Sequence, residues 1–310
     1  SANGGSTGAV SITGTITGTG NITKTGTSPF TISNDQASTY SGTTTIQQGT
    51  LVLGHSGALG TGTFAFNTNN DTTATIQSLN ASALSIANVV TFGGGNAGSV
   101  RAFGAASGGT GSLTFTDTTN ISLGSTIRRF DVKSTTQFDA GFTGTGGITM
   151  QTGTGTLILN GVNTYTGATT VNAGTLLVND SLSSTTGGVT VGASGTLGGT
   201  GTINGATVIN GSLTPGNSPG VLTFGSTLNL AGTTTFEIDG ITRGTLYDGI
   251  DVTGVLTNGG ILSLNFGSAF LTGGETFDLF ALSGGQSGDF SAIDLIGSYT
   301  GSLTNNSGVW

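Results

Sequence analysis

Short stretches in which apolar and polar residues alternate recur along the whole chain. Val10-Ser11-Ile12, Val189-Thr190-Val191 and Leu228-Asn229-Leu230 are examples, and Gly, Asn or Thr residues lie close to each of them. Alternation with a period of two residues predicts half-buried β-strands, whereas the 3.6-residue period of an amphipathic helix is almost absent. Glycine supplies the positive φ that tight turns need, and threonine favours strands. The sequence therefore predicts an all-β protein.

The spacing of these stretches distinguishes a β-solenoid from a β-sandwich. Between residues 186 and 238 they recur every 5 to 9 residues. A β-sandwich needs longer strands and wider spacing. A solenoid instead closes a coil of about 18–25 residues from three short strands and stacks it on the next coil at about 4.8 Å. We therefore expect a β-solenoid.

The chain also contains an internal repeat. Residues 39–54 align without gaps to residues 164–179, and residues 18–26 match residues 144–153 at nearly the same offset. Two copies of one multi-coil unit are thus present, which supports the solenoid. Identities between the copies include Tyr40/Tyr165, Gly42/Gly167, Thr44/Thr169, Thr45/Thr170, Gly49/Gly174, Thr50/Thr175 and Leu51/Leu176.

The repeat resembles a known family. The run N-T-Y-T-G-A-T-T-V-N-A-G-T-L at residues 163–176 is similar to the autotransporter-associated β-strand repeat, also called the passenger-associated transport repeat. Residues 213–224 resemble the turn that follows this repeat in such proteins, and residues 247–254 resemble one of their strands. The resemblance implies a right-handed parallel β-helix on a secreted or cell-surface protein, such as an adhesin or an autotransporter passenger. It implies no particular activity.

Composition narrows the possible functions. The chain has 310 residues with 59 Gly, 14 Asp+Glu, 6 Lys+Arg, one His and no Cys, and only 6% of its residues are charged. Without Cys it forms no disulfide and no thiolate metal site. A net charge of −8 and the lack of a basic cluster argue against nucleic acid as a partner, and no apolar run is long enough for membrane insertion. We expect a secreted protein whose signal peptide was removed before Ser1.

Acidic residues are distributed unevenly along the chain. Residues 221–310 hold 8 of the 14 acids. We predict two β-solenoid repeat units, at residues 1–140 and 141–225, and a C-terminal acidic β module at residues 226–310 that caps them with longer strands. Asn258-Gly259-Gly260 has the composition of a hairpin turn inside this module.

His55, the only His, lies in a Gly-His-Ser-Gly turn. A catalytic triad would combine it with Ser56 or a distant Asp, but we interpret it as a solvated turn residue. Glu237 and Asp239 share one face of a strand, and such a pair by itself is a weak indication of a glycan-active enzyme. We expect no catalytic residue and no enzymatic activity.

The densest charged stretch consists of Arg128 and Arg129 with Asp131, Lys133 and Asp139. A polysaccharide lyase or hydrolase would use such a set on a sugar. Because both signs are mixed within a few residues, we interpret the stretch as local ion pairing on an exposed coil.

Calcium is the one metal ion that the sequence leaves open. The repeat-in-toxin pattern G-G-x-G-x-D requires an Asp, but at residues 198–203 that position is Ile203. The polar run at residues 67–71 and the pair Asp248 and Asp251 offer oxygen ligands, although the run lacks the Gly and distal Glu of an EF-hand loop. We expect no cofactor, with calcium as the alternative.

Phenylalanines gather in the middle and at the end of the chain. We interpret them as stacked ladders inside the solenoid. The alternative is an exposed subset that binds sugars or supports assembly. These residues are Phe64, Phe66, Phe92, Phe103, Phe115, Phe130, Phe138, Phe142, Phe266, Phe270, Phe277, Phe280 and Phe290.

Together these features favour a structural role. A solenoid ends in unpaired strand edges, and we expect the edge near Val10, Ile12, Ile16 and Ile22 to pair with the acidic module of a neighbouring copy. Such head-to-tail contacts would build an extracellular filament, sheath or biofilm matrix. The partners would be further copies of the chain and, as an option, surface glycans. The alternatives are an adhesin or passenger stalk that displays a binding tip, and a glycan-active β-helix enzyme.

Overall fold

The computed structural model describes residues 9–34, 36–68, 71–105, 108, 110–182, 187–267 and 275–297. The chain divides into two compact units, Ser1–Gly167 and Ala168–Trp310, and each is considered by itself below. The described residues form β-strands and no helix, and the strands within each unit pair in parallel. The predicted all-β fold and its parallel β-helical coils are confirmed. The three-part division at 140/141 and 225/226 stays a prediction.

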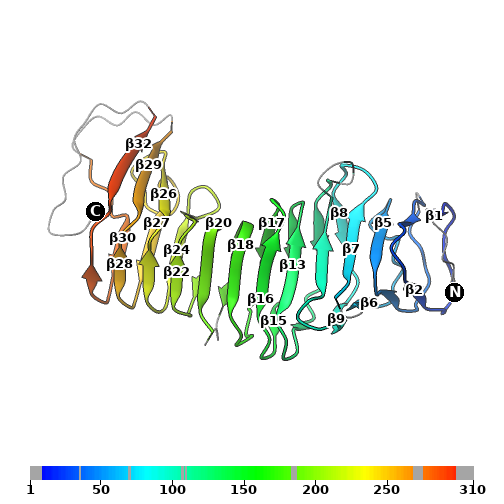
Figure 1. Cartoon of the computed structure of the whole chain (residues 1–310). Helices are drawn as coiled ribbons and strands as arrows, with labels where there is room; N and C mark the ends of the chain where they lie inside the picture. Colours follow the sequence, from blue (N-terminus) through cyan, green and yellow to red (C-terminus); the bar gives the residue numbers. More distant parts are fainter. Residues whose placement is uncertain are drawn as a thin grey trace. The chain divides into compact units, whose positions relative to one another are not determined.

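Unit 1 stacks its strands in columns, so that a strand pairs with the equivalent strands of neighbouring coils (Figure 1). The longest column consists of β1 (Val10–Ile12), β3 (Phe30–Ile32), β5 (Gly49–Leu53), β7 (Thr73–Ser78), β10 (Val100–Phe103), β13 (Arg128–Val132) and β16 (Ile148–Thr152). A second column consists of β2 (Ile22–Lys24), β4 (Thr44–Ile46), β6 (Phe64–Thr68) and β9 (Val90–Gly94). The remaining strands are β8 (Leu84–Ile86), β11 (Leu113–Phe115), β14 (Thr136–Phe138) and β17 (Thr156–Leu159) in a third column, and the pair β12 (Ile121–Ser122) and β15 (Phe142–Thr143).

The core of unit 1 is a stack of equivalent side chains from successive coils. The register places Phe30, Leu51 and Ile76 in line across β3, β5 and β7, and both Leu51 and Ile76 are fully buried. Because each inward position repeats from coil to coil, an apolar side chain is covered by its equivalents before and after it. The alternation seen in the sequence therefore decides which side chains enter the stack.

Phenylalanines fill much of this interior, which confirms the predicted ladder in unit 1. Phe115 and Phe138 stack with ring centroids 4.6 Å apart and planes 9° apart. Other rings meet edge-on, such as Phe103 and Phe130 at 5.4 Å. Phe270 lies outside the described residues. The buried members in unit 1 are Phe64, Phe66, Phe92, Phe103, Phe115, Phe130, Phe138 and Phe142.

Glycine is required at one corner of the repeat. Gly49 has a φ of +77°, and a Cβ there would collide with the carbonyl oxygen of Gly26 in the preceding coil. The equivalent Gly174 has a φ of +73°. A left-handed backbone with no room for a side chain explains why both copies of the repeat carry glycine at this position.

Unit 2 begins with two long paired strands, β18 (Thr169–Val178) and β20 (Val189–Gly199). In the next coil two shorter strands, β22 (Thr207–Ile209) and β23 (Ser212–Pro215), pair with β20. These columns continue through β25 (Leu228–Leu230), β28 (Leu256–Asn258) and β31 (Gln286–Ser287), and through β26 (Thr233–Ile238), β29 (Ile261–Phe266) and β32 (Ala292–Ile296). A third column holds β19 (Ser181–Leu182), β21 (Thr202–Ile203), β24 (Val221–Phe224), β27 (Gly249–Val252) and β30 (Phe280–Leu282).

The predicted hairpin at Asn258-Gly259-Gly260 is wrong. These residues form a corner between β28 and β29, which pair in parallel with strands of the neighbouring coils. The Gly260 N–H donates to the carbonyl of Leu230 at 2.8 Å, and a Cβ at Gly260 would collide with the carbonyl of Gly232 in the coil before. The glycine is needed for close stacking of coils, and not for a two-residue hairpin turn.

The acidic C-terminal segment continues the coils with longer connections. Leu176 is opposite Leu197 at the start of unit 2, 21 residues away. In the last coils, Ser291 Oγ donates to the carbonyl of Gly260, 31 residues away. Part of the added length is the turn between β26 and β27, which carries a polar network.

Candidate functional site

Three of the residue pairs shared by the two copies of the repeat lie in the core, namely Tyr40/Tyr165, Thr44/Thr169 and Leu51/Leu176. Tyr40 and Tyr165 are at most 1% exposed, and so are Thr44 and Thr169. The Tyr40 hydroxyl is hydrogen-bonded to Thr44 Oγ1. Burial raises the pKa of Tyr40 above its ordinary value, so this hydroxyl is not prepared for acid–base chemistry at neutral pH. These shared Tyr and Thr side chains therefore belong to the packing of the coils, whereas the shared Thr45/Thr170 and Thr50/Thr175 are half-buried.

Asn163 joins neighbouring coils within unit 1. Its side chain is fully buried, its Oδ1 accepts the Phe142 N–H at 3.0 Å, and its Nδ2 donates to the carbonyl of Gly161 at 2.6 Å. A buried amide that satisfies backbone groups in this way stabilises the corner of a coil. The Asn of the repeat pattern is therefore structural.

Asp248 is the most perturbed acid in unit 2. It is 1% exposed, its Oδ1 accepts the Gly220 N–H at 2.8 Å, and its Oδ2 accepts the Glu237 N–H at 2.8 Å. Burial raises the pKa of Asp248 to about 6, and the nearby charges of Glu237 and Asp239 act in the same direction, against the two hydrogen bonds. The carboxylate holds the turn before β24 against β26.

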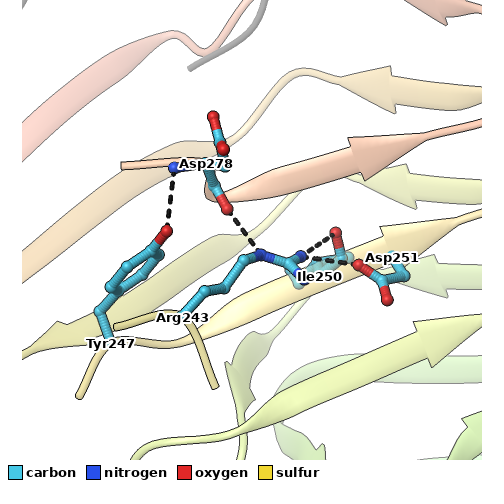
Figure 2. A network of polar contacts seen from close by, with 5 residues as sticks. All are labelled: Arg243, Tyr247, Ile250, Asp251 and Asp278. Carbon is cyan, nitrogen blue, oxygen red and sulfur yellow. Dashed lines mark hydrogen bonds and ion pairs between the residues drawn. The ribbon is translucent and has the colours of Figure 1, made fainter. Parts of the chain in front are cut away.

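A second polar network fixes the turn between β26 and β27 (Figure 2). Arg243 Nε donates to the carbonyl of Asp278 at 2.7 Å, and its Nη2 contacts the carbonyl of Ile250 at 3.2 Å and Asp251 Oδ1 at 2.7 Å. The Tyr247 hydroxyl accepts the Asp278 N–H at 3.3 Å. One arginine thus ties the turn to β27 and to the segment before β30.

The anchored turn exposes two apolar side chains. Ile241 is 67% exposed and Leu246 is 44% exposed, the former being the largest value among the large apolar residues of the described chain. Gly240 lies close to Leu246, because a Cβ there would fall within 2.8 Å of the Leu246 side chain. Ile241 and Leu246 are thus exposed on a turn that Arg243 anchors.

The predicted assembly edge lies in the first coil of unit 1. Val10 and Ile12 belong to β1, Ile22 belongs to β2, and Ile16 lies between these strands, where its carbonyl accepts the N–H groups of Thr39 and Tyr40. In the described residues β1 pairs with β3 alone. Val10 is in register with the buried stack position of Leu51, yet it is 44% exposed.

The last coil of unit 2 shows the same feature. In the part of the chain that the structure describes, β32 pairs with β29 alone, and Leu295 is in register with Leu264. Leu264 is 3% exposed, whereas Leu295 is 42% exposed because no described residue covers it. Among the described residues, β1 and β32 therefore each continue an apolar stack that nothing covers on one side.

The repeats can now be compared with known families. The model of the passenger-associated-transport-repeat matches residues 22–53 and 151–178. The chain carries two passenger-associated transport repeats. Repeats of this kind indicate a secreted or cell-surface protein. A comparison with curated proteins gave no match. The residues that the structure describes include no helical segment with the length and hydropathy needed to cross a bilayer.

The charged stretch beyond the first repeat is only partly the exposed ion-pair cluster that the sequence predicts. Lys133 Nζ and Asp131 Oδ2 form an ion pair at 3.1 Å. Arg128, however, is 6% exposed and donates from Nε to the carbonyl of Leu123 at 2.8 Å, from Nη1 to Gly94 at 3.0 Å and from Nη2 to Phe92 at 3.3 Å. For Arg128 the exposed-coil interpretation is wrong, because backbone carbonyls at a coil corner replace solvent.

Arg101 is a buried charge that the sequence analysis missed. It is fully buried on β10, in register with Ala74 of β7 and Phe130 of β13, which are also fully buried. Its Cζ lies 5.7 Å from the centre of the Phe92 ring. Alternation along Val100–Phe103 does not predict this burial. Arg101 and Ala102 point to opposite faces of the strand, and both are buried.

His55 and the aspartates considered for calcium make contacts with nearby protein groups. The Gly57 N–H donates to His55 Nδ1 at 2.9 Å, as in a turn. Both oxygens of Asp248 accept backbone N–H groups, and Asp251 pairs with Arg243. In the run at residues 67–71, residues 69 and 70 lie outside the described residues. Over the described ranges, no cluster of three or more His, Cys, Asp or Glu side chains is arranged for a metal ion.

Proposed function

We propose that this chain is an exported, non-enzymatic β-helix whose copies join end to end. The observation that carries this proposal is the apolar stack at β1 and at β32, which the described residues leave uncovered: Val10 and Leu295 occupy core positions of their columns but are about half exposed. The repeats support the exported location. The buried Tyr, Thr and Leu pairs shared by the repeats take part in coil packing, which supports a structural role.

The chemistry of the two edges suits a second copy of the same chain. Strands β1 and β32 both belong to parallel columns, and a parallel strand with a free edge presents alternate N–H and C=O groups to the next strand. Adding the β1 column of one copy to the β32 column of another would cover Val10 and Leu295 together. Because the two edges differ, the contact is heterologous and can propagate into a filament, sheath or matrix.

Sedimentation velocity and negative-stain electron microscopy over a concentration series test this proposal. We expect assemblies that grow with concentration for the unaltered chain, and monomers for Val10→Lys and Leu295→Lys. Ile127→Lys and Val255→Lys are matched controls, because Ile127 is 45% and Val255 is 44% exposed at positions away from both edges. Assembly that is unaffected by the edge variants, or equally affected by the controls, would contradict the proposal.

A display stalk is the second candidate, and the turn anchored by Arg243 favours it. That turn presents Ile241 and Leu246 on a fixed support, as a binding tip would. Binding of the monomeric chain to immobilised surface glycans or to cells, lost in Ile241→Asp and kept in Val255→Asp, would support display. A screen on acidic and neutral polysaccharides with detection of new reducing ends completes the test, and we expect no cleavage.

A further inference from the structure

Two arginines meet in the interior of unit 1 without an acidic partner. Arg101 Nη2 donates to the carbonyl of Gly94 at 3.2 Å, and Arg128 Nη1 donates to the same oxygen at 3.0 Å. The two guanidinium groups therefore lie next to each other. The ion pairs of the described residues are Lys133–Asp131 and Arg243–Asp251, so neither buried arginine takes part in one.

Every side-chain nitrogen of Arg128 has a hydrogen-bond acceptor in the protein, whereas two nitrogens of Arg101 have none among the described residues. Each of the three nitrogens of Arg128 donates to a backbone carbonyl. In Arg101 only Nη2 has partners, namely the carbonyls of Gly93 and Gly94 and Thr68 Oγ1 at 3.2–3.3 Å. Its Nε and Nη1 are buried and have no hydrogen-bond partner among the described residues. A guanidinium carries five N–H donors, so three of them point into the interior without an acceptor.

Two buried guanidinium groups without a counter-charge destabilise the folded state. A buried charge needs a partner of opposite sign, and each buried donor without an acceptor costs the desolvation of that group. Burial, followed by the charge of Arg128, lowers the pKa of Arg101 to about 10. Arg101 thus keeps its charge at neutral pH, and two positive charges share one desolvated corner.

We propose that the unpartnered Nε and Nη1 of Arg101 hold a small inorganic monovalent anion, of the chloride class, inside unit 1. An anion accepts several N–H donors at once and compensates one of the two guanidinium charges, whereas a water molecule supplies acceptors without charge. The ligand must be small, because Arg101 is fully buried between Ala74 and Phe130 of the neighbouring coils and beside the Phe92 ring. Its role is structural: it completes the core of the coils around β9, β10 and β13.

Equilibrium unfolding in urea at constant ionic strength tests this site in the full chain. The reference salt is a gluconate, whose anion is too large for the interior. It is replaced stepwise by chloride or bromide. Once the site is saturated, each tenfold rise in halide concentration is expected to raise the folding equilibrium constant of unit 1 about tenfold. Arg101→Met removes the donors and should abolish this response. Arg129→Met is the matched control, because Arg129 is only half-buried and contacts Gln151, and it should keep the response.

Crystals grown in sodium bromide give a second readout that does not depend on any variant folding. An anomalous peak within hydrogen-bond distance of Arg101 Nε and Nη1, together with the halide response in solution, would establish the site. A water molecule at these nitrogens without an anomalous peak would overturn the proposal. So would a halide response equal to that of gluconate, or a peak without any response in solution, which would mean binding at crystal concentration only.

Discussion

Each unit buries charge, but the two units do so in opposite ways. Unit 1 buries Arg101 and Arg128 at one corner, and no carboxylate pairs with either. Unit 2 buries one carboxylate, Asp248, and supplies both of its oxygens with backbone N–H donors. The comparison shows that a β-helix can accommodate a charge through its own backbone, since coil corners expose carbonyls to a cation and N–H groups to an anion.

The largest effect is expected when a charge satisfied by backbone carbonyls is removed. Arg128→Met leaves the carbonyls of Phe92, Gly94 and Leu123 without its donors, and we expect unit 1 to lose about 3 kcal/mol of unfolding free energy. Urea denaturation measures this loss. The control Arg129→Met should change stability by about 0.5 kcal/mol or less. Equal losses in the two variants would show that burial at the corner does not matter.

Asp248 makes the stability of unit 2 depend on pH. Its pKa is about 6 in the folded chain, against an ordinary value of 3.8 for an aspartate, so the folded state binds the proton more tightly. This stabilisation is complete below about pH 3.8 and is lost as the pH rises through 6. A shift of this size corresponds to at most about 3 kcal/mol.

Urea unfolding of unit 2 between pH 4 and pH 8 measures this dependence. Asp248→Asn cannot titrate and should give a flatter profile, while Asp294→Asn, on an exposed strand position, should leave the profile unchanged. If both variants keep the slope of the unaltered chain, the buried carboxylate is not its source.

A smaller loss of stability is expected for Arg243, which pairs with the carboxylate of Asp251 and also donates to two backbone carbonyls. Arg243→Met removes the donors to Asp278, Ile250 and Asp251, and we expect unit 2 to lose about 1–2 kcal/mol. The turn should also open locally, which limited proteolysis with chymotrypsin detects as faster cleavage after Leu246 or Tyr247. Cleavage at the unaltered rate would mean that the apolar side chains alone hold the turn.

The smallest change in stability is expected for the exposed ion pair between Lys133 and Asp131. Lys133 and Asp131 lie 3.1 Å apart, with the Lys133 side chain 36% exposed. An ion pair in contact with solvent contributes little, so Lys133→Ala should change the unfolding free energy of unit 1 by less than about 0.5 kcal/mol. A loss close to that of Arg128→Met would remove the distinction between exposed and buried charge.

Several features of the fold could be predicted from local sequence. Alternation at Val10–Ile12 and Leu228–Leu230 predicted strands, and the repeat with Gly49 and Gly174 predicted equivalent coils, as the structure shows. The interior position of Phe115 and Phe138 followed from the same pattern. These features depend on a few neighbouring residues, and strand alternation and turn conformation are local properties of the chain.

The features that the sequence did not determine all depend on contacts between coils. Arg101 and Arg128 are buried because β9 of one coil brings its corner carbonyls to side chains that follow 7 to 36 residues later. Asn258-Gly259-Gly260 is a corner and not a hairpin because its flanking strands pair with other coils. By itself, the sequence determined that this chain forms stacked parallel coils. Only the tertiary structure decided which charges they enclose and which edges stay open, because both depend on the register between coils.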